Sequence, residues 1–407
     1  MIWDQVETRA LERDISAIAA RGEPITVDTA PVGADTPERH DAARIYAAAA
    51  QRVREWPPDQ RLNLWSVDVD SRNAPAIADL EAKYRPDVPV LQLVDQAAPL
   101  DFNGFGDVEL ESEEPFYLLD TLAGIRSDLY SARGRGDDAA ASLFSAVRLQ
   151  RTFTDSFYAP LVMGRVLGSL RVLLRHSSPS EQALARLQEA IEALPDTDSL
   201  VHDVQGRRAE LIDRWSRPSG TISEAVLLRL LRPWITRSKR AQLRALDESM
   251  AVAREPWPAK AVSANALERK YEPELRAATQ RGFFARIASP YSRAVAPLYV
   301  TGSGTYLAAR RVAVSTLAVE RYRRRHGGAL PETLDALVPT YLREVPRDPF
   351  SGTPLIYRRT RDAYLVYSVD RNGKDDGGTF YGLGSKAQLN VQQGAPRDLG
   401  IRVDMTK

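Results

Sequence analysis

Apolar residues recur at helical spacing along most of the first 326 positions of this chain. Side chains three or four positions apart share one face of an α-helix, so this spacing predicts helices with one buried face. The first helix is expected to end at Gly22. The second is expected to end at Trp56-Pro57-Pro58, because proline lacks a backbone donor and disfavours helix in the preceding residue. Further helical segments are expected at about 73–83 and 88–96.

Two helix pairs are expected in the middle of the chain. In the first pair, residues typical of a tetratricopeptide repeat stand at Tyr130, Ala139, Leu143 and Ala146. In the second pair, the equivalent second-helix positions and the closing proline are Ala183, Leu187, Ala190 and Pro195. The two units stand 44 residues apart, counted from Ala139 to Ala183, instead of the regular repeat of about 34. The pattern therefore predicts a degenerate helical array.

A second helical region and a last long helix follow. The break at Arg217–Gly220 separates the array from a helical region of about 223–290. Gly302-Ser303-Gly304 does not fit a phosphate-binding loop, because no third glycine, lysine or preceding strand accompanies it. We interpret it as the start of the last long helix, which is expected to end at Gly327-Gly328.

The C-terminal part predicts a small α+β module. A short helix is expected at Leu330–Tyr341, followed by a β-hairpin that pairs Leu355–Arg358 with Tyr364–Val369. After Gly378 the chain is expected to be mostly irregular. The fold class predicted for the whole chain is thus mostly α, an irregular helical array followed by this module.

An acidic loop follows the hairpin and is the strongest candidate for a site. Oxygen-bearing side chains are crowded into seven positions as Asp370, Asn372, Asp375 and Asp376, and nearby glycines allow the backbone to bend. Calcium takes six to eight oxygen ligands, and such a loop predicts a calcium site. The alternative is a solvated acidic turn, because Asp, Asn and Gly favour turns without any ligand. Catalysis by these carboxylates has less support, since no partner group in a pocket is recognisable.

The same stretch resembles the C-terminal globular part of type II secretion major pseudopilins. The Asp348-Pro349-Phe350 turn with Gly352 matches a conserved turn of that family, and Ser368, Asp370, Gly373 and Gly378 approximately match its calcium-binding segment. The match covers roughly a fifth of the chain. The resemblance implies calcium at the loop and a secretion-system or filament subunit. Two features depart from the family: the apolar pilin helix is not seen at the start, and the next acidic residue after Asp376 is Asp398.

The whole chain also resembles a group of uncharacterised bacterial proteins that are exported or membrane-anchored. This resemblance implies an extracytoplasmic location and a native N-terminal anchor that precedes residue 1. The sequence pattern suggests five ranges: 1–115, 116–217 and 218–304, which are helical, the module at 305–380, and a tail at 381–407.

Composition narrows the remaining chemistry. The chain has 407 residues, with 55 Lys and Arg against 54 Asp and Glu, so the net charge of +1 gives no whole-chain argument for nucleic-acid binding. It contains no cysteine and its 4 histidines form no ligand pair, so zinc is not expected. The basic residues Arg321, Arg323, Arg324 and Arg325 are explained by favourable charge at a helix C-terminus, and an anionic partner is the alternative.

These observations predict a non-catalytic scaffold or binding protein of the cell envelope, stiffened by calcium, whose helix pairs bind a protein or peptide partner. An enzyme, such as a hydrolase whose site is assembled from distant residues, is the first alternative. A secretion-system or filament subunit is the second. The sequence leaves the oligomeric state open.

Overall fold

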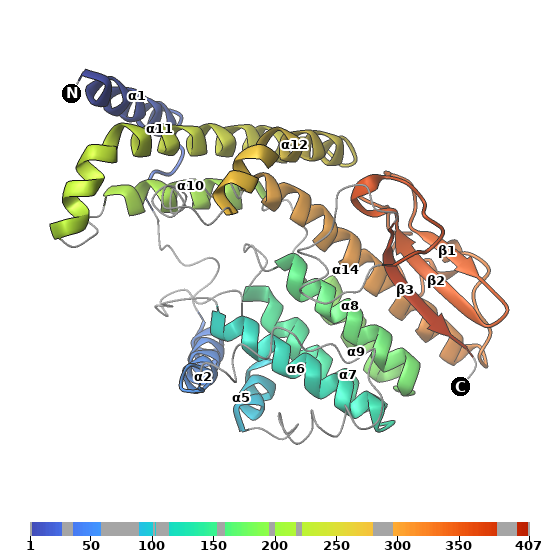
Figure 1. The fold of residues 1–407 in the computed structure, drawn as a ribbon. Helices are drawn as coiled ribbons and strands as arrows, with labels where there is room; N and C mark the ends of the chain where they lie inside the picture. The colour runs from blue at the N-terminus through green and yellow to red at the C-terminus, as the bar shows by residue number, and fades with distance from the viewer. Residues whose placement is uncertain are drawn as a thin grey trace. The chain divides into compact units, whose positions relative to one another are not determined.

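The computed structural model describes residues 2–26, 36–57, 89–100, 102, 114–152, 159–194, 200–216, 222–279, 296–380 and 397–405. The chain forms two compact units, each assembled from two separate stretches. Unit 1 comprises Met1–Thr29 with Asp198–Ser303, and unit 2 comprises Ala30–Thr197 with Gly304–Lys407. Helices dominate both units, and the strands lie near the C-terminus, so the prediction of a mostly α fold is confirmed (Figure 1).

Unit 1 is helical in its described part. Its helices are α1 (Ile2–Ala20), α10 (Leu200–Ser216), α11 (Ile222–Ala253) and α12 (Ala259–Thr279). The larger core brings apolar side chains of α10, α11 and α12 together; its most buried members include Val204, Ala245, Met250 and Ala264. The break predicted at Arg217–Gly220 lies outside the described residues.

Helix α1 packs along α11 and is held there by a small apolar core and by ion pairs. Its Ile18 joins a small core with Ile212 and Leu243. Arg240 of α11 forms ion pairs with Glu7 at 3.0 Å and with Asp14 at 2.8 Å. Charged side chains therefore contribute directly to the placement of this helix on unit 1.

A buried arginine strengthens the same region of unit 1. Arg208 of α10 is fully buried and is paired with Glu23, just beyond α1, and with Asp247 of α11, the latter at 2.7 Å. Burying a guanidinium is costly unless it is paired, so these two carboxylates are needed to keep Arg208 in the interior.

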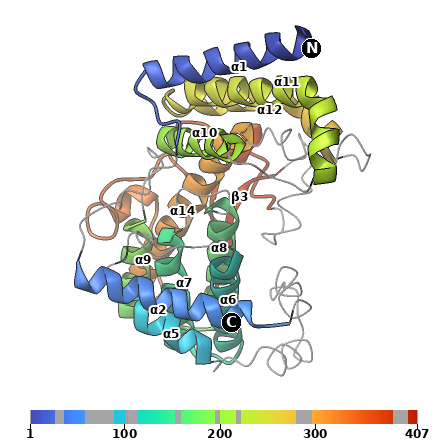
Figure 2. The ribbon, with the colours of Figure 1, turned by 90° about the vertical axis from the view of Figure 1, so that its left-hand side faces the viewer.

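In unit 2, α2 (Pro37–Arg54) and α5 (Pro89–Ala97) pack against each other and on the next helices (Figure 2). The segment predicted at 88–96 is thus a helix, while the one predicted at 73–83 lies outside the described residues. Where two helix pairs are predicted, the structure has the four helices α6 (Glu114–Ala132), α7 (Gly136–Leu149), α8 (Ala159–His176) and α9 (Glu181–Glu192). Helices α6 and α7 pack together as a pair, whereas α9 packs on α7.

These four helices pack on one another. Helix α6 contacts α8, and α7 contacts both α8 and α9. Gly136 permits a close approach at the turn, because a Cβ there would lie 2.5 Å from the backbone nitrogen of Pro179. Ser180 caps α9 by accepting a hydrogen bond from the backbone N–H of Ala183 at 3.2 Å. The predicted Pro195 lies outside the described residues.

Helix α14 spans Ala296–Arg325 and therefore begins before the predicted start at Gly304. The interpretation of Gly302-Ser303-Gly304 as a helix start is wrong, because these residues lie inside the helix. Gly302 and Gly304 are buried there, followed by the buried Tyr306 and Leu307. A glycine inside a helix costs only about 1 kcal/mol relative to alanine, and tertiary packing offsets this cost.

The short helix predicted at Leu330–Tyr341 is also wrong in length. The structure has only a 3-10 turn, η3 (Leu334–Leu337), and the rest of that range is turns. Leu334 and Leu337 are buried and anchor the turn, so packing of two leucines does not require a complete α-helix.

A three-stranded antiparallel sheet completes unit 2, in the order β1 (Ile356–Arg359), β2 (Ala363–Ser368) and β3 (Leu399–Asp404). The predicted hairpin is confirmed, with Arg359 opposite Tyr364. All six residues of β2 are buried, as expected for a central strand covered on both faces.

The prediction of an irregular tail after Gly378 is wrong for its last described part, which forms β3. In this strand Leu399, Ile401 and Val403 are buried while Arg402 is exposed. This alternation is the ordinary signal of a strand, but six residues are too few to separate it from loop by sequence alone. Strand β3 also packs against α8.

None of the helices in the described ranges combines the length and apolar content needed to cross a membrane.

Candidate functional site

The predicted calcium loop begins directly after β2 and turns sharply. Asp370–Asn372 forms a 3-10 turn, η4, which Gly373 ends with a φ of 67°. Asp370 itself has a φ of 50°, a conformation that is uncommon outside glycine but favoured by Asp and Asn. The turn sends Asp370 toward the interior of the module and the later acidic residues toward its surface.

Asp375 is fully engaged by neighbouring donors. Its Oδ1 accepts hydrogen bonds from the hydroxyl of Tyr367 and the backbone N–H of Gly377, both at 2.9 Å. Its Oδ2 lies 2.5 Å from a guanidinium nitrogen of Arg358 on β1. Partial burial acts to raise the pKa of Asp375, but the Gly377 and Tyr367 hydrogen bonds and the charge of Arg358 outweigh it and lower the pKa.

Asp376 and Asn372 bind each other. Asn372 Nδ2 donates to Asp376 Oδ2 at 2.6 Å, and the same oxygen accepts from the backbone N–H of Arg397 at 2.6 Å. Asn372 Oδ1 accepts from the backbone N–H of Lys374 at 2.9 Å. The amide oxygen and one carboxylate oxygen therefore already serve to close the loop.

Asp370 is separated from the other three by burial. Its side chain is 1% exposed, and its Oδ2 lies 3.4 Å from Nε of Arg397. Its Oδ1 accepts no hydrogen bond from the described residues. Burial raises the pKa of Asp370, against the lowering effect of the charges of Arg371 and Arg397. A buried carboxylate oxygen without a donor is costly, and it is the atom of this loop most in need of a partner.

The four predicted residues thus lie close in sequence but do not converge. Across the described part of the chain, no group of three or more acidic or histidine side chains is arranged to hold a metal ion. Asp375 and Asp376 face protein donors, while Asp370 faces inward. The arrangement as it stands does not fit a calcium ion bound by all four, and calcium at this loop stays a prediction.

Residues outside the predicted four complete the loop. Asp398, which immediately precedes β3, accepts from the backbone N–H groups of Gly378 at 2.7 Å and Asp376 at 3.3 Å. Asp348 accepts from the hydroxyl of Ser368 at 2.9 Å and the backbone N–H of Val369 at 2.8 Å. The resemblance to pseudopilins had already singled out Asp348 and Ser368. The part played by Asp398 depends on the return of the chain as β3, which sequence reasoning missed.

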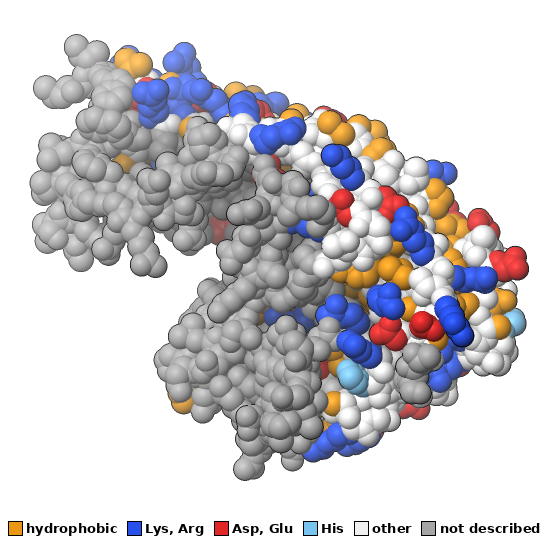
Figure 3. Space-filling model, turned by 45° about the vertical axis from the view of Figure 1, so that its right-hand side comes forward, with side chains coloured by type: hydrophobic (Ala, Val, Ile, Leu, Met, Phe, Trp, Pro, Cys, Tyr) orange, Lys and Arg blue, Asp and Glu red, His pale blue; other side chains and the backbone are white. Residues whose placement is uncertain are grey.

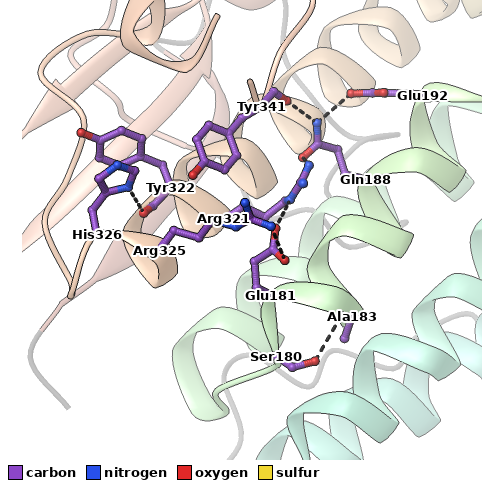
Figure 4. Close-up of polar contacts among 10 residues, drawn as sticks. All are labelled: Ser180, Glu181, Ala183, Gln188, Glu192, Arg321, Tyr322, Arg325, His326 and Tyr341. Atoms are coloured by element: carbon purple, nitrogen blue, oxygen red, sulfur yellow. Dashed lines mark hydrogen bonds and ion pairs between the residues drawn. The ribbon is translucent and has the colours of Figure 1, made fainter. Parts of the chain in front are cut away.

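A second group of polar residues joins the array to the module inside unit 2 (Figure 4). Glu181 of α9 points at two arginines of α14: Arg321, whose Nε lies 3.0 Å from Oε1, and Arg325, whose Nη2 lies 3.4 Å from Oε2. Burial acts to raise the pKa of Glu181, but the two arginines outweigh it and lower the pKa. We call Glu181, Gln188, Arg321 and Arg325 the α9–α14 junction.

Gln188 extends the α9–α14 junction to the turn after η3. Its Oε1 accepts from Arg321 at 3.1 Å, and its Nε2 donates to Glu192 at 2.8 Å and to the backbone carbonyl of Tyr341 at 2.7 Å. The guanidinium of Arg321 also lies 5.5 Å from the Tyr341 ring centre. Both the oxygen and the nitrogen of the side-chain amide thus form hydrogen bonds, so Gln188 is held in one orientation.

The basic end of α14 is therefore largely used within the fold. Besides Arg321 and Arg325, Arg323 binds the fully buried Glu320 at 2.7 Å. Tyr322 and His326 stack with ring centres 3.8 Å apart next to this end. On the face shown in Figure 3, the described Lys and Arg side chains are interspersed with Asp and Glu. These arginines therefore have specific carboxylate partners, in addition to their favourable position at the C-terminus of a helix.

A buried carboxylate inside the helix pairs is the other candidate for chemistry. Asp120 of α6 is 1% exposed, accepts from Gln150 at 3.2 Å and lies 3.4 Å from a guanidinium nitrogen of Arg165 on α8. Burial raises the pKa of Asp120 to about 6, although Arg165 and Gln150 lower it in part. Arg165 also donates to the hydroxyl of Tyr117 at 2.7 Å.

Sequence reasoning missed Asp120. The available signal was a single acidic residue within the apolar run Phe116–Ile125, which marks a buried polar group on a helix. A buried carboxylate with a raised pKa can act in proton transfer, but it can equally be a structural group that orients an arginine.

Comparison of the chain with protein-family models, curated proteins and solved structures finds no match. The pseudopilin-like character of the module accordingly rests on the residues quoted for it.

Proposed function

We propose that this protein is a non-catalytic scaffold or binding protein of the cell envelope. The observation that carries the proposal is the α9–α14 junction, in which charged side chains fix the C-terminal module to the helical array. Glu181 and Gln188 make these contacts within the fold, and their role there is to hold α9 against α14. A rigid connection of this kind suits a protein that holds a partner at a defined position.

The partner proposed is a protein or peptide bound by the helix pairs. The packed helices α6 to α9 resemble a degenerate tetratricopeptide array, and stacked helices offer a continuous surface to an extended or helical segment. A net charge of +1 gives no electrostatic reason to propose nucleic acid instead. The extracytoplasmic location and an anchor upstream of residue 1 are proposed from the resemblance to exported bacterial proteins.

Binding of solubilised envelope proteins to the immobilised full-length protein tests the proposal. We expect saturable binding that free protein competes away, with the cytosolic fraction of the same cells as the matched control. Equal binding from both fractions contradicts the envelope role. Filaments that form with rising protein concentration, seen by electron microscopy, would favour a secretion-system or filament subunit.

An enzyme is the second candidate, and Asp120 is the observation that favours it. Its carboxyl is buried, has a pKa of about 6 and lies beside Arg165, whose side chain is 20% exposed. The test is a panel of ester, phosphate, peptide and glycoside substrates with the wild-type protein and Asp120→Asn. We expect no substrate to be turned over at a rate that increases with protein concentration. Turnover that Asp120→Asn abolishes, while the fold is retained, would instead identify an enzyme.

A further inference from the structure

The loop after β2 carries several acidic side chains, and holding it in one conformation requires positive charge or hydrogen-bond donors that offset their repulsion. Asp375, Asp376 and Asp398 belong to this loop or to the segment that closes it, whereas Asp370 is buried apart from them, 3.4 Å from Nε of Arg397. The pseudopilin resemblance predicts a calcium ion for this purpose. The geometry of the described residues offers a different source of positive charge.

Arg358 approaches the loop from the neighbouring strand. One guanidinium nitrogen lies 2.5 Å from Asp375 Oδ2, and the guanidinium carbon lies 5.5 Å from the centre of the Tyr367 ring. Tyr367 in turn donates its hydroxyl to the other oxygen of Asp375. Arg358 is therefore oriented by both an aromatic ring and a carboxylate. A guanidinium held in this way loses less conformational entropy when it forms its ion pair with the carboxylate.

Backbone N–H groups supply the rest of the closure. Gly377 donates to Asp375, Gly378 and Asp376 donate to Asp398, and Arg397 donates to Asp376. Each acidic side chain at the surface of the loop thus has a donor from the protein itself. A calcium ion that used these oxygens would have to displace Arg358 and break several of these bonds.

We infer that the guanidinium of Arg358 and the returning segment at Arg397-Asp398 close the loop in place of a metal ion, so that its rigidity does not depend on calcium. This inference concerns the loop alone and is independent of the scaffold role.

Hydrogen exchange of the full-length protein, followed by mass spectrometry at residues 370–380, tests the inference. In wild type we expect the same protection in excess chelator and in millimolar calcium. Arg358→Gln is expected to speed exchange of these amides several-fold in both conditions. Arg358→Lys, which keeps the charge but loses the planar fork, is expected to fall between the two.

Arg402→Gln is the matched control, because Arg402 forms a comparable exposed ion pair with Asp404 at 2.9 Å away from the loop. It should leave exchange at 370–380 unchanged. Calcium that slows exchange of the wild-type loop overturns the inference, as does a loop whose protection is the same in Arg358→Gln and wild type.

Discussion

The carboxyl of Asp120 makes the stability of unit 2 depend on pH in a defined direction. Burial raises its pKa from 3.8 to about 6, so protonation favours the folded state. The stabilisation is present in full below the ordinary pKa and is lost as the pH rises to about 6. The shift corresponds to about 3 kcal/mol at most, from 1.36 kcal/mol per pKa unit.

Asp120→Asn isolates this effect, because the amide does not titrate. We expect the free energy of unfolding of wild type, minus that of the variant, to fall as the pH rises from about 4 to 6 and to be constant above. Urea denaturation across this pH range measures it. Asp138→Asn, at an exposed position of α7, is the control for replacing an acidic residue in the same unit. A flat difference for Asp120→Asn means that the carboxyl is not buried as described.

Glu320 is the second residue with a large expected effect. It is fully buried, and its Oε1 accepts from the hydroxyl of Tyr364 at 2.8 Å while its Oε2 binds Arg323 at 2.7 Å. Glu320→Leu leaves both donors without this acceptor, and breaking a buried pair in this way costs about 3–5 kcal/mol. Chemical denaturation checks the loss. Glu320→Gln keeps the shape and an acceptor for Tyr364, so it should lower the free energy of unfolding clearly less than Glu320→Leu does. Equal losses would assign the effect to the lost negative charge instead of the hydrogen bond from Tyr364.

At this scale the sequence located the acidic loop correctly but not the partners of its residues. Asp370, Asn372, Asp375 and Asp376 were found by their density within a few positions. Some of their donors are local, such as Gly377 for Asp375, but Arg358 on β1 and the backbone N–H of Arg397 before β3 lie more than ten positions away along the chain. Local patterns carry no information about which strand edge a carboxylate will meet, because strand pairing decides it.

Among the elements, β3 is placed so closely against β2 that a single methyl group would disturb it. A Cβ on Gly400 would lie 2.5 Å from the carbonyl oxygen of Val366 and would also collide with Tyr367 on β2. Gly400→Ala is therefore expected to lower the free energy of unfolding of unit 2 by about 1–3 kcal/mol, as overpacking does elsewhere.

Gly206 in α10 is the contrasting position, because a Cβ there meets nothing within 4 Å. Gly206→Ala should be neutral or stabilise unit 1 by up to about 1 kcal/mol, the ordinary gain of alanine over glycine in a helix. Differential scanning calorimetry of the two variants makes the comparison. A Gly400→Ala protein as stable as wild type would contradict the close pairing of β2 with β3.

The helices were predicted well and the ends of elements poorly. Apolar spacing identified α1, α2 and the helices from α6 to α9, whose apolar side chains are buried in the cores. It placed the start of α14 at Gly304 instead of Ala296, because glycines inside a packed helix look like helix ends in the sequence. It missed β3, because a six-residue strand becomes recognisable only when its partner is known.

For the whole molecule, the third strand makes the C-terminal module larger than the hairpin that the sequence suggested. A chain that ends after Phe380 lacks β3 and leaves one edge of the buried β2 without its partner. We expect its unit 2 to lose cooperative thermal unfolding or to melt at least 10 °C lower. A chain that ends after Met405 keeps β3 and should melt as the full-length protein does. Near-ultraviolet circular dichroism and calorimetry distinguish the outcomes.

The units themselves are not contiguous, and this could not be read from local patterns. Residues at the start of the chain belong with Asp198–Ser303, and Ala30–Thr197 belong with the C-terminal part. The reason is physical: α1 has only a small apolar face, and the carboxylates of Glu7 and Asp14 find their cation on α11. Such pairing depends on the surface of a helix that lies far away in the sequence.

That separation has a consequence for the order in which the protein can form during synthesis. Arg240 follows Glu7 by 233 positions. At a translation rate of roughly 5–20 residues per second, α1 waits for tens of seconds before its partner helix leaves the ribosome. Meanwhile the helix pairs from α6 to α9, whose contacts are local, can already associate. The first segment to be made is therefore among the last to find its place, and during that interval its apolar stripe is open to any chaperone that binds nascent chains.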